Sequence, residues 1–422
     1  MARIQTVLAA IKRSPQDHLP SRETVDQICR EVDHDYRDRV LSPYVFIQLF
    51  CLQVLGGNTA VNHLRHLSGV NFSSSSYCEA RKNLPLKFFE ALLKRMADTV
   101  GNHNIKDQMI GPDRRIVFKD GSTFSMPDIP ELREYFGLPP GQAEGIGYPV
   151  AKFMALLDHV TAMFVRFAPM PNSTHDMAGA SALHPELKSG DILVADCAFC
   201  SVVHLLMLVA MGVDSIFCLH QRRPKKAGRQ HWRKPPARER PDWIEQVTFL
   251  GLSEGIDIRI VEHVIRRKGF RNQVIHIATT LLDESQWPDE VIIRIYGERW
   301  NIETCFNHLK TTMGMNVLKC KSLDCILKEL AVYLIVYNMV RLVMLRAAEA
   351  QSADVSRISF IDAMRQLMTR MIGLPGVDNL IINPSRPHRL EPRARRRRPN
   401  SYPYMTKPRH HMKAAIFVGK MR

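Results

Sequence analysis

The sequence predicts an α/β protein in which an all-helical N-terminal domain precedes an α/β core, and a mostly β insertion interrupts that core. Three observations lead to this prediction. Apolar residues recur every three or four positions between about residues 17 and 99, as on the buried face of helices. After Gly111-Pro112, short runs typical of strands alternate with helical patterns. Further strand-like runs follow a basic segment, which places the insertion at about residues 220–285.

The helical pattern of the N-terminal domain, assigned to residues 1–108, has recognisable starting points. Ser42-Pro43 fits an N-cap followed by the first helical turn, and apolar residues follow it at helical spacing. A second helical pattern follows Leu84-Pro85. Between them, residues 73–76 are expected to form a polar loop, in a corner that resembles a helix-turn-helix.

The core, assigned to residues 109–380, begins with a regular alternation of strands and helices. The apolar runs predict strands at residues 115–119, 150–157, 162–167, 192–195 and 215–219, and helices at 177–187 and 201–211. The predicted order is therefore β-β-β-α-β-α-β.

The insertion begins with a segment that cannot bury a core of its own. Residues 222–240 contain nine Lys or Arg, three prolines and a single acidic residue. Strands are then expected at residues 247–252, 256–264 and 273–279.

Helices return at Asp289 and continue to about Met371. The most apolar stretch, residues 330–345, is too short to cross a bilayer, so we expect a buried helix and no membrane span. Residues 381–422 form a basic C-terminal tail with little to pack.

Composition narrows the class of partner. The chain has 422 residues, of which 45% are hydrophobic, enough for two or three packed domains. Its 58 Lys and Arg against 42 Asp and Glu give a net charge of +16, which favours a polyanion such as nucleic acid or an anionic membrane surface. Nine scattered cysteines and an N-terminus without a signal-type apolar run indicate reduced thiols in the cytoplasm.

Residues 296–310 contain the most informative pattern. At about 100° per residue, Tyr296, Arg299, Glu303 and Lys310 share one face of a helix, beside an apolar stripe. A carboxylate with a cation on each side suits an acid that holds a metal while its neighbours grip a phosphodiester. The alternative for an isolated helix is a solvated face with an i,i+4 Arg-Glu pair.

Two more carboxylates are expected where core strands end. Asp120 closes the predicted strand 115–119, and Gly121 then allows a sharp turn that exposes the acid. Asp196 closes the strand 192–195 in the same way. Ligands of α/β folds bind at such strand ends, although a lone Asp there more often caps a turn.

Together, these residues resemble the DDE transposases of bacterial insertion sequences, specifically the insertion-sequence-four family. The family's mark is Tyr, two residues, Arg, three residues, Glu, six residues, Lys, and this chain matches it without a gap. Asp-Gly-Ser at 120–122 and the run 190–196 resemble its first and second acid motifs. The N-terminal region and the β-rich insertion fit as well, so the resemblance spans nearly the whole chain.

The resemblance implies a ribonuclease-H-like core in which Asp120, Asp196 and Glu303 are catalytic and hold two Mg²⁺ ions, with Mn²⁺ able to replace them. It also implies an enzyme that binds terminal inverted repeats, cleaves the element's ends by two-metal hydrolysis and joins the 3′-ends to target DNA. Its partner is double-stranded DNA, bound by a homodimer that holds two ends. Such a protein acts in the cytoplasm, at the nucleoid.

By the same resemblance, Tyr296, Arg299 and Lys310 contact phosphates at the transposon end. Trp300 projects near them, where it either stacks on a displaced base or packs in the core. The family often has Arg directly after the second Asp, and this chain has Cys197 there. That departure affects any DNA contact made by the Arg and leaves the metal role of Asp196 intact.

Other interpretations are less favoured. Cys197 and Cys200 with Cys320 and Cys325 lack the spacing of a zinc site. A structure-specific nuclease on the same scaffold does not explain the Tyr-Arg-Glu-Lys spacing. A catalytically silent or domesticated DNA-binding protein derived from a transposase is the main alternative, and loss of an acid would favour it, whereas all three acids are present.

Overall fold

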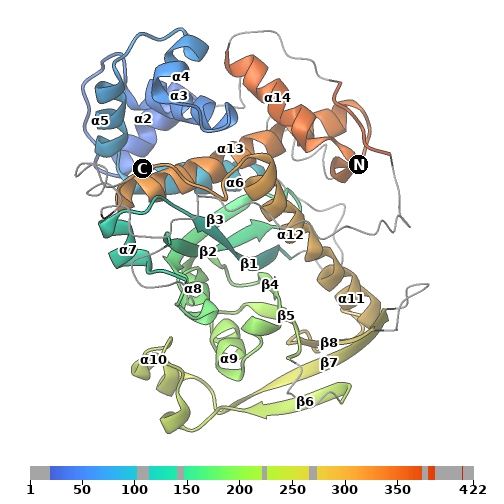
Figure 1. Cartoon of the computed structure of the whole chain (residues 1–422). Coiled ribbons are helices and arrows are strands. Elements are labelled where there is room, and N and C mark those ends of the chain that lie inside the picture. The colour runs from blue at the N-terminus through green and yellow to red at the C-terminus, as the bar shows by residue number, and fades with distance from the viewer. Residues whose placement is uncertain are drawn as a thin grey trace.

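One mixed sheet runs through the computed structural model of the chain (Figure 1). The structure describes residues 20–101, 114–139, 147–220, 226–265, 273–372, 379–384 and 411. Within these residues the sheet has eight strands in the order β3-β2-β1-β4-β5-β8-β7-β6. Their bounds are β1 Ile116–Ser125, β2 Val150–Asp158, β3 Phe164–Pro171, β4 Ile192–Ala195, β5 Asp214–Cys218, β6 Gly228–Arg233, β7 Gly255–Ile265 and β8 Gln273–Thr279.

The predicted β-β-β-α-β-α-β order is confirmed except for one additional helix. Strands β1, β2 and β3 form an antiparallel meander, and β4 and β5 run parallel to β1. The helices between them are α8 (Asp176–Ser181), with the short η1 (His184–Glu186), and α9 (Val202–Ala210). A further helix, α7 (Pro130–Phe136), lies between β1 and β2, where no element was predicted.

Strand β1 is longer than predicted, so Asp120 lies inside the strand and not at its end. The strand continues past the acid to Ser125, because β2 pairs with it along its whole length. Gly121 therefore forms no turn, and it lies in the ladder opposite Met154. A Cβ at this glycine would lie 2.7 Å from the Met154 Sδ atom, so the missing side chain makes room for that methionine.

Strands β6, β7 and β8 continue the sheet beyond β5, and the predicted strands 256–264 and 273–279 are confirmed as β7 and β8. The predicted strand 247–252 is wrong, because this segment forms α10 (Gln246–Gly251). Its backbone bonds close locally, with the Phe249 N–H donating to the Glu245 carbonyl at 2.9 Å. Val247 and Leu250 are exposed, so the alternation of apolar residues does not correspond to a buried strand face.

The N-terminal segment is helical as predicted, with α2 Arg22–Glu31, α3 Pro43–Leu55, α4 Val61–Ser68, α5 Ser74–Asn83 and α6 Leu86–Gly101. Ser42 and Pro43 are the N-cap and first residue of α3. The predicted loop at residues 73–76 is instead the start of α5. Ser73 and Ser76 form a reciprocal capping box there, which satisfies two free backbone N–H groups.

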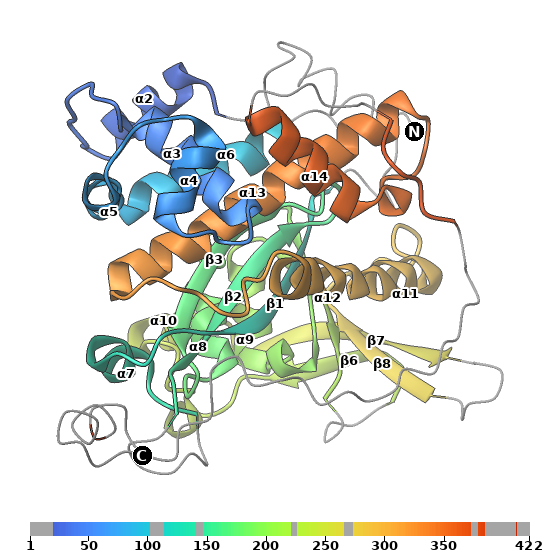
Figure 2. The same ribbon diagram turned by 45° about the horizontal axis from the view of Figure 1, so that its top comes forward.

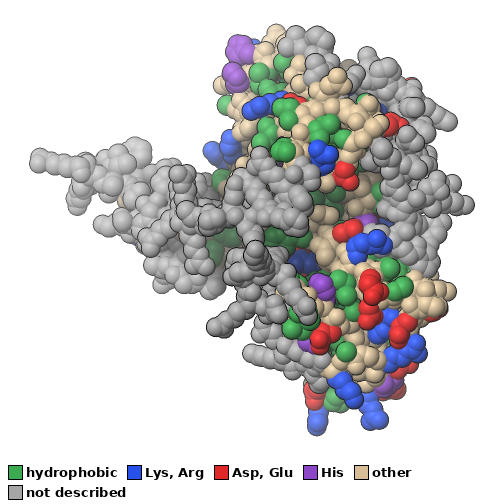
Figure 3. All heavy atoms as spheres, turned by 90° about the vertical axis from the view of Figure 1, so that its right-hand side faces the viewer, with side chains coloured by type: hydrophobic (Ala, Val, Ile, Leu, Met, Phe, Trp, Pro, Cys, Tyr) green, Lys and Arg blue, Asp and Glu red, His purple; other side chains and the backbone are tan. Residues whose placement is uncertain are grey.

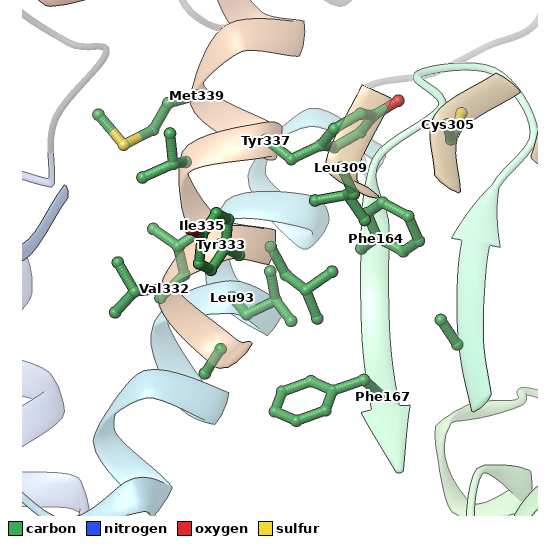
Figure 4. Close-up of a cluster of buried hydrophobic side chains, with 14 of the residues drawn as sticks. Leu93, Phe164, Phe167, Cys305, Leu309, Val332, Tyr333, Ile335, Tyr337 and Met339 are labelled. Carbon is green, nitrogen blue, oxygen red and sulfur yellow. The ribbon is translucent and has the colours of Figure 1, made fainter. Parts of the chain in front are cut away.

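Helix α13 (Leu323–Ala350) passes between the N-terminal helices and the sheet (Figure 2). By length and composition it is apolar enough to cross a membrane, but 94% of its most apolar window is buried inside the molecule. This confirms the buried helix predicted for residues 330–345. Figure 4 shows Tyr333 and Tyr337 of this helix in a cluster with Leu93 of α6 and Phe164 of β3.

Buried side chains cover both faces of the sheet. One cluster joins residues of α2 to α6 with α13 and with alternate residues of the central strands, including Phe118, Val194 and Ile216. A second cluster joins the opposite face of these strands to α8, α9 and α10. The N-terminal helices therefore share a hydrophobic core with the α/β part. The boundary at residues 108 and 109, and nearly all of the basic tail, lie outside the described residues.

Buried charges on α13 hold the N-terminal helices in place. Glu329, which is 1% exposed, accepts hydrogen bonds from Asn58 Nδ2 and from the backbone N–H groups of Lys319 and Cys320. The Lys328 ammonium donates to the Arg81 and Lys82 carbonyls at 3.0 and 2.9 Å, at the end of α5.

Glu329→Ala is expected to lower the free energy of unfolding by about 2–3 kcal/mol, because it leaves several buried donors without an acceptor. Urea unfolding measures this value. Glu349→Gln, near the other end of α13, is the control and should change it by about 0.5 kcal/mol or less. An equally small effect of Glu329→Ala would contradict the anchoring role.

Candidate active site

Two acids stand side by side on the sheet face that α11–α13 cover. Phe118 of β1 pairs with Val194 of β4, and Asp120 and Asp196 each follow two residues later. They therefore lie at the same level of adjacent parallel strands, on one face. Asp196 directly follows β4 and caps the short helix η2 (Cys197–Phe199) by accepting from the Ala198 N–H at 2.9 Å.

The third acid lies on a helical segment that crosses this face. Three pieces follow one another: α11 (Asp289–Glu298), α12 (Trp300–Asn307) and a π-helical turn, η4 (His308–Thr312). The single helix predicted for residues 296–310 is thus interrupted at Arg299 and widened at its end. Arg299 keeps right-handed helical dihedral angles, φ −52° and ψ −30°, so α11 and α12 continue in nearly one direction (Figure 1).

An arginine connects the helix to the strand. Arg299 Nη1 donates to Asp120 Oδ2 at 3.1 Å, and Arg299 Nη2 donates to Glu303 Oε1 at 3.3 Å. One turn back, the ring centroid of Tyr296 lies 5.8 Å from the guanidinium carbon of Arg299. Lys310 Nζ donates to Thr123 Oγ1 of β1 at 3.3 Å. The structure therefore brings the predicted Tyr, Arg, Glu and Lys to the strand that carries Asp120.

The electrostatics of the site follow from burial and crowded carboxylates. Burial raises the pKa of Asp120 to about 6, and the nearby charges of Asp196 and Glu303 add to the shift, while the Gly121 N–H and Arg299 oppose it. Burial also raises the pKa of Tyr296, so its hydroxyl stays protonated and able to donate. The site is thus a partly desolvated group of carboxylates around one guanidinium.

The donor set fits a divalent cation in chemistry. Carboxylate oxygens are the hard ligands that Mg²⁺ and Mn²⁺ prefer, and Asp120, Asp196 and Glu303 supply them from three different elements. In this conformation the Arg299 side chain lies between Asp120 and Glu303. Across the part of the chain that the structure describes, no three His, Cys, Asp or Glu side chains are placed to hold a metal.

Trp300 does not belong to the core. Its side chain is 65% exposed, one residue after Arg299, which excludes the interpretation as a packed core tryptophan. Figure 3 shows the side of the molecule on which α11 lies. Lys, Arg, Asp and Glu side chains are interspersed over its lower half and do not gather in one basic patch.

Two residues near the acids were not predicted from the sequence to be part of the site. Lys119 is fully buried, contacts His204 Nε2 at 3.3 Å and lies over the Phe199 ring at 4.5 Å. Burial lowers its pKa to about 7. On the opposite face of the sheet, Cys218 at the end of β5 lies near Tyr296 and adds to the raised pKa of that hydroxyl. The sequence did contain a signal for each residue. Lys119 lies inside an apolar strand, and Cys218 is the last residue of another apolar strand.

The π-helical turn places a histidine against α14 (Phe360–Met371). The His308 ring stacks on Phe360 with centroids 4.1 Å apart. Burial, assisted by the nearby charge of Arg341, lowers the pKa of His308 to about 4 from the usual 6.5.

The native protein therefore binds fewer protons than the unfolded chain between these two values. We expect stability to fall as the pH drops from about 6.5 to about 4, with His308 contributing about 3 kcal/mol at most. Urea unfolding across this range measures it, and His308→Phe, which keeps an aromatic ring on Phe360, should flatten the slope. An unchanged slope in the variant would show that other groups cause the loss.

The chain belongs to the family described as "Transposase DDE domain", which matches residues 111–339 and so includes all three acids. The chain is also 29% identical over 171 residues to "Transposase InsG for insertion sequence element IS4" of Escherichia coli (strain K12). That match covers 36% of this chain and 38% of the relative, so it spans well under half of the relative's length.

A structural similarity was found to the "piggyBac transposase synaptic complex with hairpin DNA" determined by cryo-EM. It has a TM-score of 0.42 and 10% sequence identity, and it covers 88% of this chain and 80% of that one.

Proposed function

We propose that this protein is the transposase of an insertion sequence, which binds the element's terminal inverted repeats, cleaves its ends and joins the free 3′-ends to target DNA. The observation that carries the proposal is the contact of Arg299 with both Asp120 and Glu303, beside Asp196 at the same level of the sheet. This contact joins the Tyr-Arg-Glu-Lys helix to the acids of β1 and β4. Membership of the DDE family supports it.

The core is proposed to be ribonuclease-H-like. The strand order β3-β2-β1-β4-β5, with an antiparallel meander beside two parallel strands, supports this assignment. Strands β6 to β8 would be the β-rich insertion, and α2 to α6 would be the N-terminal DNA-binding domain. The basic segment 222–240 and the tail 381–422 would add phosphate contacts that give affinity and salt dependence but no sequence specificity.

Asp120, Asp196 and Glu303 would hold two Mg²⁺ ions, with Mn²⁺ as a substitute. When bound, such ions activate a water or 3′-hydroxyl and stabilise the leaving oxygen of the phosphodiester. Arg299 would grip a phosphate by two parallel N–H bonds and Lys310 as a point charge, while the Tyr296 hydroxyl donates to a third oxygen. Trp300, whose side chain is exposed, would stack on a displaced base.

The proposed assembly is a homodimer in which each copy cleaves one element end, and it would act at the nucleoid in the cytoplasm. A domesticated DNA-binding protein without catalysis is the second candidate. The retained three acids and the ordered Arg299 contacts favour the enzyme.

The test is cleavage of a labelled duplex that carries the element's end, with Mg²⁺ or Mn²⁺. Nicking at the element boundary, followed by joining of the 3′-end to a second duplex, is expected. Specific binding without nicking under any divalent ion would instead identify the DNA-binding candidate. A nick that falls away from the boundary would point to a nuclease of another kind.

A further inference from the structure

The Arg299 side chain occupies the centre of the acid group. It is 15% exposed, whereas the carboxylates that it contacts are more open, at 20% for Asp120 and 39% for Glu303. Its Nε atom is buried and has no hydrogen-bond partner among the described residues. Both Nη atoms therefore serve the two acids, while one donor of the guanidinium remains unsatisfied.

Both oxygens of Asp120 already have partners. Oδ1 accepts from the Gly121 N–H at 2.8 Å, and Oδ2 accepts from Arg299 at 3.1 Å. Glu303 Oε1 likewise faces the guanidinium. A cation that binds these acids must compete for the same oxygens, because two positive charges at one carboxylate pair repel each other strongly in a partly desolvated site.

The guanidinium has a stronger partner when DNA is present. Its fork matches two oxygens of a phosphate, and a phosphate would also give the unsatisfied Nε–H an acceptor. Movement of Arg299 from the acids to a phosphate would leave Asp120 and Glu303 as uncompensated carboxylates beside Asp196. A divalent cation would then be the preferred counter-charge of these three carboxylates.

We propose that Arg299 is a built-in counter-ion that competes with the divalent metal for Asp120 and Glu303, and that a bound DNA phosphate removes it, so that DNA and metal bind cooperatively. This inference rests on the proposed function, since it assigns a second role to a residue of that site. Cooperativity of this kind would keep the DNA-free enzyme poorly loaded with metal. By linkage, metal must then strengthen DNA binding by the same factor as DNA strengthens metal binding.

The experiment measures Mn²⁺ binding to the full chain by electron paramagnetic resonance of the free ion, with and without an end duplex. Arg299→Gln keeps a polar side chain but removes the competing charge. Without DNA it is expected to bind Mn²⁺ roughly 5- to 150-fold more tightly than wild type, the usual range of coupling between two sites. Arg133→Gln removes a guanidinium that pairs with Asp128 elsewhere and is the matched control, with no expected change in Mn²⁺ affinity.

The duplex should tighten Mn²⁺ binding to wild type far more than to Arg299→Gln. Equal Mn²⁺ affinities of wild type and Arg299→Gln without DNA would overturn the inference. Should circular dichroism show that the Gln variant is unfolded, Arg299→Lys replaces it. One ammonium cannot bridge both acids as the fork does, so this variant should also bind Mn²⁺ more tightly.

An Asp120→Asn variant separates this inference from the proposed function. If Asp120→Asn binds Mn²⁺ as wild type does, the acids are not a metal site and the proposed function itself fails, and the inference with it. If Asp120→Asn loses Mn²⁺ while Arg299→Gln matches wild type, the metal site stands and only the counter-ion role is rejected.

Discussion

Glu303→Gln is expected to lower the cleavage rate of an element-end duplex by about 10³-fold or more, equivalent to about 4 kcal/mol of activation free energy. Gln keeps the shape of the side chain and removes the charge that would hold the metal. Without divalent ions, binding of the same duplex should stay within about threefold of wild type, because Arg299 and Lys310 remain in place. Single-turnover cleavage and a gel-shift titration measure the two quantities.

The matched control is Glu290→Gln, which changes an exposed carboxylate in the first turn of α11 on the same helical segment. It should cleave at the wild-type rate. If Glu303→Gln also cleaves at that rate, Glu303 is not a metal ligand and the assignment of the third acid is wrong.

The second large effect concerns the core beneath the site. Phe164 of β3 is fully buried and packs against Phe306 of α12, with ring centroids 5.9 Å apart. It also packs against Tyr337 of α13, with ring centroids 4.9 Å apart (Figure 4). Phe164→Ala should lower the free energy of unfolding by about 3–5 kcal/mol, since it removes a large buried ring and leaves a cavity. Chemical denaturation measures the loss.

Because Phe306 lies one turn after Glu303, the same change should also weaken cleavage at temperatures where the variant is still folded. Phe164→Leu, which fills most of the space, is the control and should cost markedly less stability. A loss as small as about 1 kcal/mol in Phe164→Ala would mean that the surrounding side chains collapse into the space.

Much of the fold was predictable because the strands of the core are short apolar runs separated by turn residues. The prediction failed where local hydrogen bonding decides the structure. At residues 73–76 a capping box converts a polar run into a helix start. At residues 247–252 the apolar residues alternate as in a strand, but the backbone closes on itself as α10, and Phe249 is the buried residue of that helix.

The candidate site was predictable in its parts and not in its contacts. The spacing of the motif places Arg299 and Glu303 on one helical face, whatever the tertiary structure. The contact between Arg299 and Asp120 joins residues 179 apart, and no local pattern encodes it. Lys119 was missed for a similar reason, since its burial depends on His204, which comes from α9 on the far face of the sheet.

The pairing of β5 with β8 has a consequence for any attempt to shorten this protein. Ile216 and Phe217 of β5 pair with β4 on one side, and these two residues and Cys218 pair with residues 277–279 of β8 on the other. Excising residues 228–279 would turn this apolar strand into an open edge, which is a template for aggregation. A minimal, soluble catalytic fragment must therefore retain β8 or replace it with another strand that covers β5.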